Sequence, residues 1–131
     1  MMGDVLELVC ARSALIGTAR LRPLDKGLGI YGGPMETMPG YASVEGVIRR
    51  LMEHIVDGVG NEASLSAAFR ERDSLGLLVR AGSGALLHPG AVHIEDWGPW
   101  LPEEDVWVEL LEVPREEARA VFEAEPPHSD S

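Results

Sequence analysis

The sequence predicts an α+β fold, an antiparallel sheet with helices packed on one face. Period-two alternation of apolar residues marks both ends of the chain, a helical period marks its middle, and the strands are grouped rather than alternating with helices. A chain of 131 residues with 45% apolar residues can bury one core without disulfides or metals. We therefore expect a single domain over residues 1–125 and a disordered tail over residues 126–131.

Two strands are expected first, over Val5–Ala11 and Leu15–Leu21, because apolar residues alternate with polar or small ones in both. Their closeness in sequence predicts an N-terminal hairpin. From Pro23 to Tyr41, glycine or proline recurs almost every third residue, which predicts a long loop with at most a short strand at Leu28–Tyr31. Gly27–Gly32 in this loop matches G-x-G-x-x-G, but no helix can follow it, so we assign no nucleotide site there.

The middle of the chain predicts two helices. Apolar residues at helical spacing from Val44 to Val59 indicate an amphipathic helix, with Ser43 as its N-cap and Gly58 or Gly60 closing its end. A second, weaker helix is expected from an Asn61 cap to about Arg72. We expect both central helices to pack on one face of the sheet.

The period returns to two after the second helix. Residues 75–97 contain three short apolar stretches separated by turns at residues 82–84 and 89–90, which predicts an antiparallel meander. A further strand is expected over residues 105–113. Pro114 then suits the first position of a short C-terminal helix, because proline at that position loses no intrahelical hydrogen bond.

The charge of the chain is strongly negative and unevenly distributed. Acidic residues number 22 against 11 basic ones, a net charge of -11, and residues 95–131 hold twelve of the acidic residues but only two of the basic ones. Such a charge repels nucleic acid. The apolar stretches are also too short to cross a bilayer, so we expect neither nucleic acid nor a membrane as partner.

The cysteine content and the N-terminal sequence indicate the compartment, and the motifs of the chain bear on the cofactor. The single cysteine, Cys10, cannot form an internal disulfide, and no basic segment precedes the first strand, so the expected compartment is the cytoplasm. No pattern in the chain is specific for a cofactor, and we predict none. We also expect no enzyme activity, although a small enzyme stays open as an alternative.

All three tryptophans lie between positions 97 and 107. We expect Trp97 and Trp100, in a Gly/Pro loop, to plug the edge of the core; the alternative is an aromatic binding surface ringed by acids. The leading hypothesis is a small acidic binding or regulatory protein, of inhibitor or immunity type, that contacts a basic protein partner or a second copy of itself. Its candidate binding residues are Trp97, Trp100, Glu95, Asp96, Glu103 and Glu104.

The alternative function is a ligand-binding protein or a metal-dependent enzyme. His93 and Glu95 share one face of an expected strand, and His88 comes close if the chain folds back at Pro89-Gly90. Imidazole and carboxylate together suit a divalent transition metal. In this alternative, His88, His93 and Glu95 form the site and the glycine-rich segment 23–41 covers it.

Overall fold

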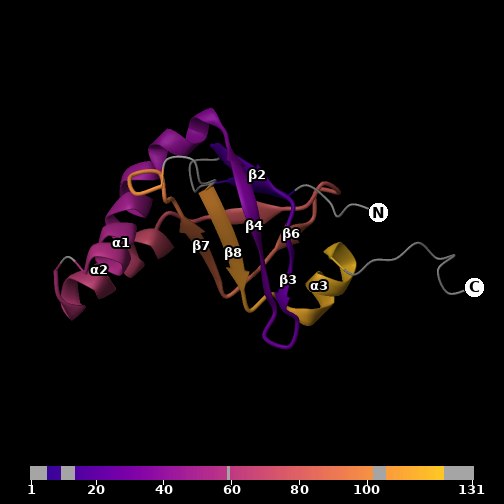
Figure 1. Ribbon diagram of the computed structural model, residues 1–131. Coiled ribbons are helices and arrows are strands. Elements are labelled where there is room, and N and C mark those ends of the chain that lie inside the picture. The colour runs from indigo at the N-terminus through magenta and orange to yellow at the C-terminus, as the bar shows by residue number, and fades with distance from the viewer. Residues whose placement is uncertain (1–5, 10–13, 59, 102–105, 123–131) are drawn as a thin grey trace, which may run out of the picture.

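The computed structural model describes residues 6–9, 14–58, 60–101 and 106–122, and at its centre lies a curled antiparallel sheet (Figure 1). Within these residues the sheet has eight strands in the order β6-β5-β1-β2-β4-β8-β7, with β3 paired to β4. With three α-helices beside it, the sheet confirms the predicted α+β class. The strands are β1 Leu6–Val9, β2 Leu15–Ala19, β3 Arg22–Asp25, β4 Ile30–Thr37, β5 Leu78–Arg80, β6 Leu86–Leu87, β7 Ala91–Glu95 and β8 Val106–Leu111.

The curl follows from a short connection between the two edges. β6 and β7 stand at opposite ends of the strand order, yet only residues 88–90 join them. In a flat sheet, six steps of about 4.8 Å would separate these strands by about 29 Å. Four fully extended peptide steps reach only about 14 Å. The sheet must therefore curl until its edges approach each other.

The predicted meander is correct only for its first hairpin. β5 pairs with β6, but β7 does not continue from β6 and pairs instead with β8, with Ile94 opposite Val108. The turn at residues 89–90 leads from one edge of the curled sheet to the other. Local alternation predicts strands well, but it contains no information on which edge a short strand joins.

The N-terminal hairpin is confirmed. β1 pairs antiparallel with β2, with Leu6 opposite Ala19, and β1 also pairs with β5 on its other side. Leu6, Leu8 and Ile16 are fully buried in the main core. Cys10 lies outside the described residues, and so do residues 126–131, for which a disordered tail is predicted.

The prediction of a long loop over residues 23–41 is wrong. β3 and β4 form a hairpin across the turn Lys26–Gly29, and a 3-10 helix follows over Pro39–Ser43. β4 lies between β2 and β8. Glycine serves close packing here, because a Cβ atom on Gly33 would lie 2.6 Å from the backbone oxygen of Arg20.

Two helices, α1 Glu45–Asp57 and α2 Glu62–Asp73, lie side by side next to β7 and β8 (Figure 1). Gly58 closes α1 with a φ of 65°, as expected, and Asn61 begins α2 with a capping box to Ser64. The predicted N-cap of α1 is wrong. Val44 takes that position, because the Ser43 hydroxyl donates to the Gly40 oxygen within the preceding 3-10 turn.

The third helix, α3 Arg115–Val121, lies across the sheet from α1 and α2 (Figure 1). Pro114 is its N-cap and not its first helical residue. The ring of Phe122, directly after α3, stacks on the ring of Tyr31 from β4 at a centroid distance of 4.1 Å. No helix in the described part of the chain is long and apolar enough to cross a membrane.

The packing of β4 makes Gly33 a sensitive position. We expect Gly33→Ala to lower the free energy of unfolding by about 2 kcal/mol, because the added methyl group meets rigid backbone. Gly46→Ala on α1 is the control, since a Cβ atom there meets nothing closer than 3.5 Å and alanine favours the helix. Urea unfolding measures both. Equal effects of the two substitutions would contradict the close approach at Gly33.

Candidate functional site

The tryptophan loop, residues 96–101, is anchored at its first residue. Asp96 is only 3% exposed, and its carboxylate accepts hydrogen bonds from the Tyr41 hydroxyl at 2.8 Å, the Arg49 Nε at 3.2 Å and the Gly98 N–H at 2.9 Å. Tyr41 belongs to the 3-10 helix and Arg49 to α1, so two elements hold the start of the loop. A buried carboxylate needs such donors, because an unpaired one would carry a large desolvation cost.

The buried position beside Asp96 shifts the pKa of Tyr41. Burial of the phenol and its hydrogen bond to Asp96 raise the pKa of Tyr41 well above its ordinary value of 10.0. Both causes favour the neutral phenol, which then donates its proton to the carboxylate. Arg49 completes the group by pairing with Glu45 at 3.0 Å, so the cation bridges two carboxylates.

The two loop tryptophans form an edge-to-face pair at the margin of the fold. Their ring centroids are 6.3 Å apart with an interplanar angle of 73°. Both side chains are partly buried, and neither belongs to the main core cluster. The Trp97 indole N–H donates to Glu95 at 3.2 Å, and the Trp100 indole N–H donates to Asp57 at the end of α1 at 3.2 Å. The loop is thus tied to β7 and to α1 through aromatic side chains.

Trp107 repeats the arrangement on the neighbouring strand. Its indole N–H donates to Glu109 at 3.0 Å, and in the β7–β8 ladder Trp107 lies directly opposite Glu95. Opposite residues in an antiparallel pair stand about 5 Å apart, so Glu95 adjoins both Trp97 and Trp107. We call this group the acidic tryptophan surface; it comprises Trp97, Trp100, Trp107, Asp57, Glu95 and Glu109.

An exposed apolar side chain adjoins this surface. Leu101, directly after Trp100 at the end of the tryptophan loop, is 51% exposed. Asp96, predicted as a binding residue, serves instead as the buried anchor described above. Glu103 and Glu104, also predicted as binding residues, lie outside the described residues.

His93 and Glu95 are brought together as the alternation predicts, with His93 Nε2 3.2 Å from Glu95 Oε2. The other ring nitrogen, Nδ1, lies 3.2 Å from a guanidinium nitrogen of Arg72. Because a guanidinium can only donate, Nδ1 must accept, and Nε2 carries the proton and donates to Glu95. Both ring nitrogens are therefore engaged, and a metal at His93 would have to displace one partner.

Arg72, at the end of α2, is a site residue that sequence reasoning missed. It is 8% exposed, forms an ion pair with Asp73 at 2.9 Å and places its guanidinium 5.0 Å from the centre of the Phe69 ring. A sequence signal for it was absent, since arginine in the last helical turn is common on exposed surfaces. Asp57 was missed for the same reason, as a polar residue on the outer side of α1.

His88 has a different partner, Glu117 of α3. The Glu117 carboxylate accepts from the His88 backbone N–H at 2.6 Å and lies 2.7 Å from the ring Nδ1. His88 and Arg72 line a pocket of about 470 Å³, whereas the glycine-rich turn Lys26–Gly29 lines another pocket with α3. Neither lining includes His93 or Glu95. Among the described residues no three His, Cys, Asp or Glu side chains are placed to hold a metal ion.

The buried phenol of Tyr41 predicts a specific pH dependence. Its raised pKa contributes stability fully below pH about 10, and that contribution is lost as the pH rises further. We expect Tyr41→Phe to cost about 1 kcal/mol near neutral pH, and the deficit to shrink above pH about 10. Urea unfolding of both proteins across this range measures the effect. A constant difference would contradict the assignment.

The hydrogen bonds of His93 predict one tautomer. In its neutral form, the ring should carry the proton on Nε2, because Arg72 donates to Nδ1. Nitrogen-15 chemical shifts of the ring, read from long-range proton couplings, distinguish the two tautomers. Arg72→Gln should reduce this preference, and a proton found on Nδ1 in the unaltered protein would contradict the network.

Comparison of the chain with models of protein families, with curated proteins and with solved structures finds no match. The function must therefore be argued from the chemistry of the surfaces and pockets themselves.

Proposed function

We propose that this protein is a non-enzymatic binding protein whose acidic tryptophan surface takes up a basic segment of a protein partner. One observation carries the proposal. Each of the three indole N–H groups donates to a carboxylate, so aromatic faces and negative charges are held side by side. A surface of this composition offers two favourable interactions to the same cation.

The two interactions are an ion pair and a cation–π contact. A carboxylate that accepts one indole hydrogen bond keeps lone pairs for a lysine or arginine of the partner. The face of a tryptophan ring attracts the same cation, by about 0.5–1 kcal/mol where it is exposed and more where water is excluded. Aromatic residues partly buried at a surface are also enriched among the residues that dominate binding energy.

Preorganisation favours binding further. The tryptophan loop is fixed by Asp96 at its start, by Trp97 on Glu95 and by Trp100 on Asp57. Side chains already held in one arrangement lose little entropy when a partner binds. The acidic surplus of residues 95–131 adds a long-range attraction, which raises the rate of encounter with a basic partner.

Binding to a basic protein is what an inhibitor or an immunity-type protein does, because such a protein neutralises its basic partner by covering it. A second copy of this acidic chain is a less suitable partner, because the acidic surface would meet an equally acidic protein. The proposed compartment is the cytoplasm, since a single cysteine leaves no internal disulfide to maintain.

The test uses a peptide of alternating lysine and leucine as the probe, titrated into the full chain by calorimetry. We expect saturable binding that weakens as salt is raised from about 50 to about 500 mM, because added ions screen exposed charges. Trp100→Ala should weaken binding at least about tenfold through loss of the aromatic face. Glu95→Gln should weaken it several-fold and reduce the salt dependence.

The matched control is Glu116→Gln, which removes one negative charge from an exposed position on α3, across the sheet from α1 and α2. It should leave peptide binding nearly unchanged. An equal loss with Glu116→Gln and Glu95→Gln would mean that only net charge matters, and would overturn the proposal. Concentration-dependent sedimentation that Trp100→Ala abolishes would instead identify a second copy as the occupant, and would overturn the basic partner.

A further inference from the structure

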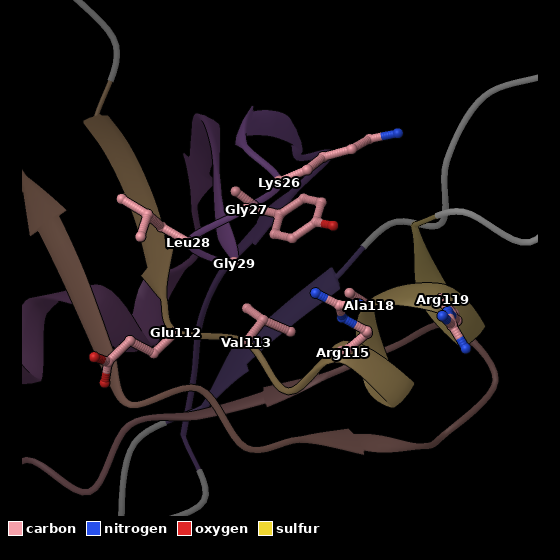
Figure 2. A pocket seen from close by; sticks show the side chains of 10 residues that line it. Lys26, Gly27, Leu28, Gly29, Glu112, Val113, Arg115, Ala118 and Arg119 are labelled. Atoms are coloured by element: carbon pink, nitrogen blue, oxygen red, sulfur yellow. The ribbon is translucent and has the colours of Figure 1, made fainter.

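A second site lies across the sheet from α1 and α2. The turn Lys26–Gly29, the end of β8 and α3 enclose a pocket of about 590 Å³ (Figure 2). This volume lies within the range of pockets that hold small molecules. Three cations line it, Lys26, Arg115 and Arg119, although the protein as a whole carries a net charge of -11.

The three cations have no partner within the described part of the chain, where none of them makes an ion pair or a side-chain hydrogen bond. Arg49, Arg50 and Arg80 each pair with a carboxylate. Arg20, Arg22 and Arg70 also have no such partner among the described residues, but only at this pocket do three unpaired cations of the described chain line one cavity together. Arg115 and Arg119 stand four residues apart on one face of α3, where like charges repel each other. A local conflict of this kind is expected at functional or strained sites, and an anion bound between the two arginines would relieve the repulsion.

The one acid in the lining does not neutralise these cations. The Glu112 side chain lies against Gly90, and Figure 2 shows its carboxylate pointing away from Arg115 and Arg119. The pocket therefore keeps a surplus of positive charge. Guanidinium groups match the oxygens of a phosphate in pairs, and a lysine adds a point charge.

The backbone around the pocket is held in place. Glu112 is the one described non-glycine residue with a positive φ, 55°, a conformation that costs about 1 kcal/mol. Gly29, with a φ of 70°, accepts a hydrogen bond from the Val113 N–H at 3.0 Å, and a Cβ atom on Gly29 would lie 2.8 Å from the Val113 oxygen. Strained backbone of this kind persists where its surroundings fix it, and it clusters at ligand sites.

The lining also has an apolar part. Tyr31, Val113 and Ala118 are each at most 5% exposed and contribute to this pocket. An inorganic anion would leave that part unused. From the cations and the apolar wall together we infer that this pocket binds a small organic phosphate monoester, with the phosphate between Lys26, Arg115 and Arg119 and the organic group on Val113 and Ala118. This site is separate from the acidic tryptophan surface.

Phenyl phosphate is the probe, titrated into the full chain by calorimetry. We expect one saturable site per chain, with weaker binding of inorganic phosphate, which lacks the ring, and of benzoate, which has one charge fewer. Binding should also weaken as the pH falls below about 6, where the phosphate takes up its second proton. Arg115→Gln and Arg119→Gln should each reduce affinity about tenfold, the loss expected for one charged hydrogen bond.

Arg70→Gln is the matched control, because Arg70 is an exposed arginine on α2 and not part of this pocket. It should leave the affinity unchanged, and circular dichroism should show that all three variants remain folded. The inference is overturned if phenyl phosphate shows no saturable binding up to about 10 mM, tenfold above a millimolar dissociation constant. It is also overturned if Arg70→Gln weakens binding as much as Arg115→Gln does.

Discussion

The connection between β6 and β7 is the constraint on which the rest of the structure depends. Three residues cannot bridge the width of a flat sheet, so the sheet curls and its two edges meet. At this seam the Gly90 N–H donates to the Leu111 oxygen at 2.7 Å, and His88 binds Glu117 on α3. The seam therefore fixes the end of β8 and the position of α3, and the residues after β8 together with α3 form one half of the lining of the pocket that holds Lys26, Arg115 and Arg119.

Several acidic residues have structural roles that the net charge of the chain does not reveal. Asp96 is buried with three donors, and Asp57, Glu95 and Glu109 each accept an indole N–H. A carboxylate held in this way keeps its charge but loses its freedom to turn away. The negative potential near the tryptophans consequently has a fixed shape, and fixed charges favour one arrangement of a partner over others.

The elements that the sequence predicted well are those whose pattern is local. The helical spacing after Val44 locates α1, and alternation locates β1, β2 and β8. β4 was missed because Gly33 and Pro34 resemble breakers, whereas Gly33 admits the backbone of Arg20 at close range. The acidic tryptophan surface likewise has a part that is local in sequence and a part that is not. Glu95 and Trp97 are near neighbours in sequence, but the bond from Trp100 to Asp57 spans 43 positions and depends on the tertiary fold.

β8 connects the two sites, because it carries Trp107 and Glu109 and its last residue, Leu111, directly precedes Glu112 in the lining of the pocket. A strand rises about 3.4 Å per residue, so Glu109 and Glu112 stand about 10 Å apart along it. That distance is close to the Debye length at physiological ionic strength, about 8 Å, so exposed charges at the two sites are largely screened from each other. An anion in the pocket and a cation on the tryptophans would thus bind nearly independently, unless the strained backbone at Glu112 moves and shifts β8 with it.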